Sequence, residues 1–269
     1  MTVRDLEADA SASIGSEESA DWFGSDTRIA SDSNQVRAEY VDSKGRPLSW
    51  ADSVRKFRSK HGPEHRFGKR WASGLWGKWL DRDRKLVSRT ETTLMLSLTA
   101  SPWLSDSHIL PPANHLESLL KGLRIVCDEL SDSIGASHRI GWGLGTQRTG
   151  YAHAHVGIYC FDHVDPIVAE PVLDEFTRTV PMADPSEHGA GAITARHGAD
   201  MLAERTATDD RAPATSLGAY LADNVPGSGS TPEAGMGVEN ELGAGDAHRV
   251  QLATVLDATE TEAYRRPAL

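Results

Sequence analysis

Apolar residues stand at every second position in several short stretches near the middle of the chain. Residues 92–99, TTLMLSLT, place a leucine at each second position. Because successive side chains of a strand point to opposite faces, this alternation predicts a strand with one buried face. His138 to Thr146 and Tyr151 to Phe161 are two further strand-like runs. The Gln-Arg-Thr-Gly segment between them is typical of a tight turn, so the two runs are expected to pair as an antiparallel hairpin.

Other stretches repeat their apolar residues every three or four positions, which predicts helices. Such patterns cover Asn114 to Leu130, with Asn114 as a possible N-cap, and Pro166 to Thr179. Ala192 to Arg196 is expected to form a short strand, and Ser216 to Val225 is expected to form a helix that ends at a Pro-Gly pair. Helices that interrupt hairpin-paired strands indicate the α+β class, with a central antiparallel β-sheet and helices packed on it.

Composition divides the chain into four parts. Residues 1–36 are dominated by Ser, Ala, Asp and Glu, and we expect a disordered acidic arm there because little apolar surface is available for burial. Residues 37–90 form a basic, tryptophan-containing helical segment. Residues 91–226 hold the main α+β domain, and residues 227–269 form a linker, rich in Gly at its start, and a C-terminal segment.

The chain of 269 residues is acidic as a whole, with 39 acidic against 28 basic residues and a formal net charge of −11. Dispersed carboxylates with few lysines are typical of proteins that work in concentrated salt, so we interpret this as a halophile's protein. No stretch approaches the roughly 20 apolar residues of a membrane span, and we see no apolar signal sequence. Two cysteines are too few for a disulfide framework, so we expect a cytoplasmic protein without membrane contact.

Against this acidic average, residues 51–89 are locally basic and also contain tryptophans. One interpretation is a surface where cations meet phosphates and aromatic rings stack on bases. The other is a helical pair whose tryptophans lie in the core and whose basic side is solvated. Both interpretations stay open on the sequence. The candidate DNA contacts in this segment are Arg66, Lys69, Arg70 and Lys78.

Two histidines stand two residues apart in the strand-like run YAHAHVGIY, residues 151–159. His153 and His155 therefore project from the same face, and two neighbouring imidazoles can bind one divalent ion. Two neutral imidazoles also leave coordination positions open, as a catalytic metal site requires. The alternative is a pair of ordinary polar residues on an exposed strand, and the pair alone does not decide between them.

Three pieces in order give this pair its context: Leu98-Thr99 at the end of the first strand, His153-Ala154-His155, and Tyr220 in the last predicted helix. Together they resemble the motifs of the HUH endonuclease superfamily. The arrangement is similar to the rolling-circle replication initiators (Rep) of haloarchaeal plasmids and viruses. The resemblance implies that residues 91–226 are a HUH endonuclease domain with an RRM/ferredoxin-like palm. It further implies a single-tyrosine endonuclease and strand transferase that nicks single-stranded DNA at a replication origin.

The same resemblance implies a role for each site residue. Tyr220 is the nucleophile, which would form a 5′-phosphotyrosine link and leave a 3′-OH for a polymerase to extend. His153 and His155 would hold Mg²⁺ or Mn²⁺, which neutralises charge on the scissile phosphate. Gln147 is the candidate third metal ligand, with a hydrogen bond to the turn as its alternative role. Asn224, one helical turn after Tyr220, is a further candidate DNA contact.

Other interpretations of these residues stay open. Tyr220 could be a half-buried tyrosine with its hydroxyl at the surface. Two positions also depart from the family's pattern: Ala154 is small where relatives carry a bulky apolar residue, and Asp223 stands where many carry a lysine. The second departure puts the lysine's usual role near the phosphate in doubt.

Two other functions fit the same motifs. A HUH transposase of a mobile element would use them on single-stranded element ends. A non-catalytic DNA-binding regulator on a decayed nuclease fold would explain Ala154 and the missing lysine. A nucleotide hydrolase of the histidine-triad kind needs a third alternating histidine, where this chain has Gly157. Since we find no Gly-x-x-x-x-Gly-Lys-Ser/Thr sequence, we expect a replication initiator of this kind to work with a host helicase and polymerase.

Overall fold

The computed structural model describes residues 27–32, 35–40, 42–44, 46, 69–105, 108–110, 112–135, 137–147, 151–197, 217–225, 252–253, 255–256 and 259–268. The first 26 residues of the expected acidic arm, the candidate DNA contact Arg66 and the start of the expected linker lie outside these ranges.

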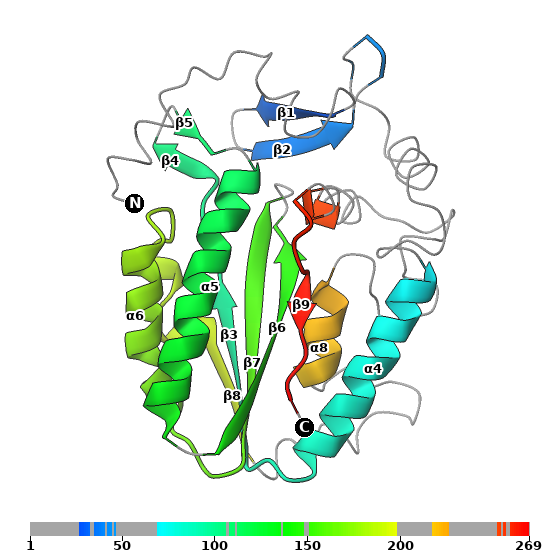
Figure 1. Cartoon of the computed structure of the whole chain (residues 1–269). Coiled ribbons are helices and arrows are strands. Elements are labelled where there is room, and N and C mark those ends of the chain that lie inside the picture. Colours follow the sequence, from blue (N-terminus) through cyan, green and yellow to red (C-terminus); the bar gives the residue numbers. More distant parts are fainter. Residues whose placement is uncertain are drawn as a thin grey trace.

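A five-stranded antiparallel sheet forms the centre of the molecule, with the strand order β8-β3-β7-β6-β9 (Figure 1). Its strands are β3 (Thr92–Leu98), β6 (His138–Thr146), β7 (Ala152–Cys160), β8 (Ile193–His197) and β9 (Tyr264–Arg265). Two separate antiparallel pairs also form: β1 (Thr27–Asp32) with β2 (Gln35–Tyr40), and β4 (Trp103–Ser105) with β5 (His108–Ile109). The predicted hairpin is the β6–β7 pair at the middle of the sheet.

Helices pack on this sheet in two groups (Figure 1). α5 (Pro112–Ile134) and α6 (Glu170–Thr179) contact each other on one side, and α4 (Lys69–Val87) and α8 (Leu217–Asn224) contact each other on the other. Short 3₁₀ helices occur in the connections, at Pro166–Ala169, Pro185–Glu187 and Ala190–Ala192. An antiparallel sheet covered by helices confirms the predicted α+β class.

The sheet face under α5 is built from aliphatic side chains, and we call it the apolar face. Leu94, Leu96 and Leu98 of β3 are fully buried and stand opposite Ile158, Val156 and Ala154 of β7. Leucines of α5 and Phe176 of α6 complete this core. Burial of one such side chain contributes about 1.5–3 kcal/mol, so this face is the main source of hydrophobic stabilisation.

The opposite face carries glycines where the apolar face carries leucines, and we call it the glycine face. Gly143 of β6 and Gly157 of β7 lie directly beneath α8: a methyl group on Gly143 would stand 2.9 Å from the Leu221 carbonyl oxygen, and one on Gly157 would stand 2.6 Å from Leu221 Cδ1. A larger side chain at position 143 would meet the α8 backbone and push the helix away from the sheet, whereas one at position 157 would displace the ends of the Leu217 and Leu221 side chains. The glycines therefore set how closely α8 approaches β6 and β7.

Three features differ from the sequence-based expectations. The helix expected from Asn114 begins at Pro112, because proline fits the first helical turn, so Asn114 is not its N-cap. β1 and the start of β2 are strands within residues 27–36, where we expected a disordered arm. β9, from the expected C-terminal segment, pairs with β6 of the main sheet. Among the described residues, no helix is both long and apolar enough to cross a membrane.

Candidate metal and nucleophile site

His153 and His155 lie side by side on the glycine face of β7. Their Nε2 atoms are 3.0 Å apart, and their rings meet edge to face with centroids 4.6 Å apart. Two imidazole nitrogens that bind one ion at about 2.1 Å, at right angles to each other, would be separated by roughly 3.0 Å. The spacing of the pair therefore fits two neighbouring ligands of one divalent ion.

Both histidines are held in their neutral form. Burial lowers the pKa of His153 to about 4, an effect that the Asn224 side chain partly opposes. Burial also lowers the pKa of His155 to about 3, and the neighbouring His153 adds to this effect. A neutral imidazole offers a lone pair, which is the form that binds a metal.

Ser97 of β3 orients the second histidine. Its Oγ lies 3.1 Å from His155 Nδ1, because Ser97 and His155 stand directly opposite each other in the β3–β7 pair. A hydrogen bond at Nδ1 fixes the ring and leaves Nε2 facing His153. Sequence analysis missed Ser97, although its position on the polar side of the first strand was a signal that could have found it.

Tyr220 lies against this pair. Its ring centroid is 5.0 Å from that of His155, at an interplanar angle of 83°. The residue is 42% exposed, whereas Leu221 and Val225 on the same helix are fully buried. The helix therefore anchors its apolar side and presents the phenol to solvent beside the histidines, as its residue spacing predicts.

Asp83 of α4 holds the start of α8. Its Oδ1 accepts a hydrogen bond from the Gly218 backbone N–H at 2.9 Å and another from the Tyr159 hydroxyl at 2.7 Å. Burial and the Asp83 carboxylate raise the pKa of Tyr159 well above its ordinary value. One carboxylate thus joins α4, α8 and β7, and it fixes the helix that carries Tyr220.

Gly145 and Asn224 close the site on the β6 side. Gly145 stands opposite His153, and a methyl group there would overlap with His153 Nε2 and stand 3.3 Å from Asn224 Cβ. The Asn224 side-chain amide donates to the Tyr220 carbonyl oxygen at 2.8 Å. Asn224, expected as a DNA contact, therefore lies between Tyr220 and His153.

Gln147, expected as a third metal ligand, directly follows β6. Its Nε2 donates to the Ala100 carbonyl oxygen at 2.9 Å and to the Ala152 carbonyl oxygen at 3.1 Å. The amide thus joins the segment after β3 to the start of β7, and its Oε1 is the atom left for a metal. Among the described residues, no group of three or more His, Cys, Asp or Glu side chains could hold an ion.

The small residue between the histidines has a packing explanation. Ala154 is fully buried on the apolar face, opposite Leu98 on one side and Leu144 on the other. Its side chain points away from the histidines, so its size affects the core rather than the site. The Asp223 side chain, expected to affect the site, lies outside the described part of the structure.

A buried histidine fixes the end of the first strand. His188 accepts a hydrogen bond from the Thr99 backbone N–H at Nε2, 3.0 Å away, and its Nδ1 is 2.7 Å from the Asp184 carbonyl oxygen. The carbonyl can only accept, so Nδ1 carries the proton. His188 is thus a structural partner of the Leu98-Thr99 motif, and sequence analysis assigned it no role.

The basic segment that precedes β3 is α4 over residues 69–87. Lys78 is exposed, and the backbone alone is described for Lys69 and Arg70. Trp79 is fully buried, whereas Trp71 and Trp76 are only partly buried. Trp79 is therefore a core residue, and of the two interpretations of this segment the aromatic platform could involve only the other tryptophans.

Comparisons with known proteins agree with the motif-based resemblance at the level of a family. No solved structure matches this chain. An "Uncharacterized 36 kDa protein" from Halobacterium salinarum is 25% identical over 210 residues, which cover 69% of this chain and 66%, just under two thirds, of the relative. This haloarchaeal relative supports the halophile interpretation of the acidic composition. The model of a family described as "Putative rep protein (DUF1424)" matches residues 34–241. The chain therefore belongs to this family of Rep proteins.

Proposed function

We propose that this protein starts replication by nicking single-stranded DNA, with Tyr220 as the nucleophile and His153 and His155 as ligands of a divalent ion. One observation carries the proposal: the partly exposed Tyr220 ring lies 5.0 Å from His155, whose Nε2 is 3.0 Å from that of His153. Membership of a Rep family supports a role in replication. The nicking chemistry and the residue roles are the proposal.

The reaction transfers a phosphoryl group from the DNA backbone to the tyrosine. Tyr220 Oη attacks phosphorus and loses its proton to solvent, the new O–P bond forms, and the bond from phosphorus to the 3′ oxygen breaks. The 3′ oxygen takes up a proton and becomes a 3′-OH. Because one phosphodiester replaces another, the reverse reaction can rejoin the strand. Mg²⁺ or Mn²⁺ at the histidines would neutralise the charge that otherwise repels the nucleophile.

The remaining residues hold this arrangement in place. Ser97 fixes the His155 ring, and Asp83 fixes the first turn of α8. We further propose that Gln147 Oε1 or solvent completes the ligand set, since Gln147 Nε2 is already bonded to two carbonyl oxygens. Asn224 contacts both the Tyr220 backbone and the His153 side, so it would position the two reacting groups relative to each other.

Covalent capture of DNA tests the proposal. The protein is incubated in concentrated KCl with single-stranded origin-like DNA and Mg²⁺ or Mn²⁺, and adducts are resolved on a denaturing gel. We expect an adduct that Tyr220→Phe abolishes and that His153→Ala or His155→Ala strongly reduces. Tyr151→Phe is the matched control, because the Tyr151 hydroxyl bonds the Leu110 carbonyl oxygen, away from the histidines, and this variant should keep the adduct.

Two results would reject the nicking mechanism. An adduct that persists in Tyr220→Phe would exclude this nucleophile. DNA binding with no adduct under either metal would favour the non-catalytic regulator instead. The transposase alternative predicts the same adduct, and the DNA sequence that is joined would separate it from an initiator.

A further inference from the structure

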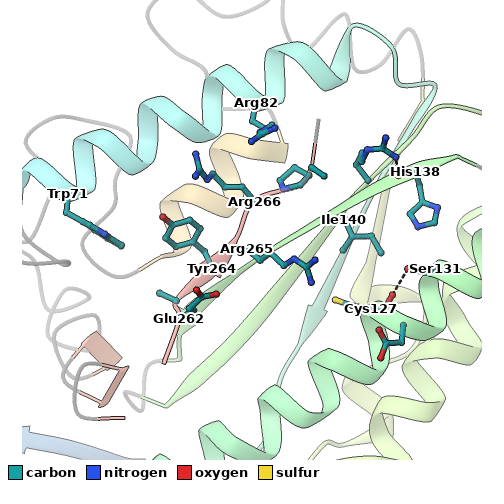
Figure 2. Close-up of a pocket in the computed structure, with 15 residues that line it drawn as sticks. Trp71, Arg82, Cys127, Ser131, His138, Ile140, Glu262, Tyr264, Arg265 and Arg266 are labelled. Atoms are coloured by element: carbon teal, nitrogen blue, oxygen red, sulfur yellow. Dashed lines mark hydrogen bonds between the residues drawn. The ribbon is translucent and has the colours of Figure 1, made fainter. Parts of the chain in front are cut away.

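The structure contains a second polar site at the open edge of the sheet, beyond β6. A cavity of about 780 Å³ lies between α4, α5 and the segment around β9 (Figure 2). Four arginines line it: Arg82 of α4, Arg139 of β6, and Arg265 and Arg266 at β9. We propose that this arginine groove binds the phosphate backbone of the single-stranded DNA that the protein acts on. The inference rests on the proposed function only in naming DNA as the partner.

The four guanidinium groups outnumber the carboxylates around them. Among the described residues, Asp128 and Glu262 are the two that contribute carboxylates to the cavity wall. Over the ranges that the structure describes, no ion pair joins any of the four arginines to a carboxylate, and what distinguishes the groove is that four such cations line one cavity. A chain with net charge −11 thus gathers unpaired positive charge in one concave place, which indicates an anionic ligand.

Arg139 supplies an independent observation. Its Nε is buried and has no hydrogen-bond partner in the described part of the chain, while one of its terminal nitrogens donates to the His138 carbonyl oxygen at 2.8 Å. The guanidinium carbon lies 5.6 Å from the centre of the Phe161 ring. An unsatisfied buried donor costs about 1–3 kcal/mol in general, so such groups usually have a ligand or water as acceptor. Nε itself is out of contact with solvent, so a phosphate in the groove would meet the terminal nitrogens of this guanidinium, for which a phosphate oxygen is an acceptor of the right charge.

Aromatic rings at one end of the groove favour a single strand over a duplex. Trp71 and Tyr264 are both half-buried, with ring centroids 6.1 Å apart and planes at 63°. Figure 2 shows them at one end of the cavity and His138 at the other, with Arg82, Arg265 and Arg266 between. Unpaired bases can stack on such rings, whereas paired bases are already stacked in the duplex.

The groove is close enough to the histidines to act on the same strand. Tyr264 stands opposite Gly143 in the β6–β9 pair, and Gly143 stands opposite His155 in the β6–β7 pair. Adjacent strands are about 4.8 Å apart, so the backbone of Tyr264 is roughly 10 Å from that of His155. A strand with its scissile phosphate at the histidines can therefore reach the groove within a few nucleotides.

The groove is suited to binding rather than to chemistry. Burial raises the pKa of the Cys127 thiol, which lines the groove, to about 11. The thiol therefore stays protonated and is a poor nucleophile.

Concentrated salt also explains how an acidic protein can bind an anion in this groove. Screening over about 3 Å at 1 M salt removes the repulsion between the anion and distant carboxylates but leaves direct contacts with the arginines.

The salt dependence of DNA binding tests the groove separately from nicking. All variants are made in the Tyr220→Phe background and measured with EDTA present, so that neither the nucleophile nor a metal contributes. Binding of a labelled single-stranded oligonucleotide is followed by fluorescence anisotropy over the KCl range in which circular dichroism shows an unchanged fold. For single strands, the slope of log K against log salt is negative, and its magnitude decreases by about 0.7 for each lost phosphate contact.

We expect Arg82→Gln, Arg265→Gln and Arg266→Gln each to reduce the magnitude of this slope by about 0.7, and the triple variant to reduce it by about 2. Arg265→Lys should restore most of the slope, because the charge is kept. Arg178→Gln is the matched control: Arg178 lies on α6, is paired with Glu175, and should leave the slope unchanged. Equal slopes for the groove variants and this control would overturn the inference, as would an absence of DNA binding by the Tyr220→Phe parent.

The two proposals can fail independently. If the slope changes as expected but no covalent adduct forms with the unsubstituted protein, the groove stands and the nicking mechanism fails. If the adduct forms and the groove variants bind like the control, the nicking mechanism stands and the groove fails. A phosphopeptide that competes more strongly than the oligonucleotide would also overturn the groove's assignment to DNA.

Discussion

The two faces of the central sheet belong to the same strands but carry different kinds of side chain. On the apolar face, β3 carries the buried Leu94, Leu96 and Leu98, and α5 and α6 cover them with further apolar side chains. On the glycine face, the same β7 strand shows His153, His155 and Gly157, and α8 lies directly on glycines. The first face stabilises the fold, and the second leaves room for polar groups at fixed distances.

This difference separates the residues that stabilise the domain from the polar residues of the candidate site. Buried polar side chains cost free energy unless they are paired, and the glycine face pairs them: Ser97 with His155, and Asp83 with Tyr159 and Gly218. The leucines on the other face supply the stability that offsets this arrangement. Substitutions on the two faces should therefore change different measurements.

The largest effect on stability is expected from Leu96→Ala on the apolar face. Leu96 is fully buried between β7 and β8, so the substitution leaves a cavity and should lower the free energy of unfolding by about 2–5 kcal/mol. Urea unfolding measures the loss. The folded fraction should still form the covalent adduct, and a variant that stays stable but loses the adduct would contradict the division between the faces.

The second prediction concerns His115, a polar residue within the apolar layer. It is fully buried, its Nε2 lies 2.9 Å from the Ala100 carbonyl oxygen, and its Nδ1 has no partner. Burial lowers its pKa to about 4, so the folded protein resists protonation while the unfolded chain, with a pKa near 6.5, does not. Stability is therefore complete above about pH 6.5 and falls as the pH drops towards 4, by about 3 kcal/mol.

Other groups also titrate in this range, so a variant isolates the contribution of His115. His115→Leu should have lower stability at neutral pH, because the Ala100 hydrogen bond is lost, but a smaller decrease between neutral pH and pH 4. Urea unfolding at a series of pH values gives both slopes. Identical slopes for the two proteins would show that His115 is not the group responsible.

Gly145→Ala tests the close packing on the glycine face. The added methyl group overlaps with His153 Nε2, so the ring must move out of line with His155. We expect Mn²⁺ affinity, measured by calorimetry, and adduct formation to fall by about 10–100-fold, as for other residues that orient metal ligands.

Gly77→Ala on α4 is the matched glycine substitution. A methyl group there meets no atom within 4 Å, and alanine favours a helix interior over glycine. Stability should rise by about 1 kcal/mol with no change in Mn²⁺ affinity. Equal loss of Mn²⁺ affinity in both variants would show that the His153 clash is not the cause.

Asp83→Asn tests how the start of α8 is held. The substitution removes the charge that accepts from Gly218 and Tyr159, which should cost about 1–2 kcal/mol and loosen the start of α8. Hydrogen exchange at the Gly218 amide should become faster. Asp81→Asn, two residues earlier and paired only with the exposed Lys85, should change neither measurement.

Local periodicity predicted the parts of this molecule that depend on local sequence. The alternation in residues 92–99 and 151–159 and the spacing of Leu217, Leu221 and Val225 placed β3, β7 and α8 correctly, including the exposed position of Tyr220. These patterns succeed because one face of each element is buried in a continuous layer.

Contacts between distant segments could not be predicted in the same way. The hydrogen bond from Gly218 to Asp83 joins residues 135 positions apart, and β9 pairs with β6 across more than a hundred residues. Nothing in the periodicity of a two-residue strand marks its partner. Composition also suggested a linker and a C-terminal segment apart from the main domain. Composition shows which residues are polar, but it does not show that a later segment pairs with the central sheet.

The position of the arginine groove in the chain has a consequence for synthesis. Ser97, the two histidines, Asn224 and Tyr220 all precede residue 226, whereas the groove also needs Arg265 and Arg266. On the ribosome, the residues of the proposed chemistry are therefore made before the groove is complete. A product that stops early would contain the proposed nucleophile and the proposed metal ligands without half of the arginines that we propose bind the strand.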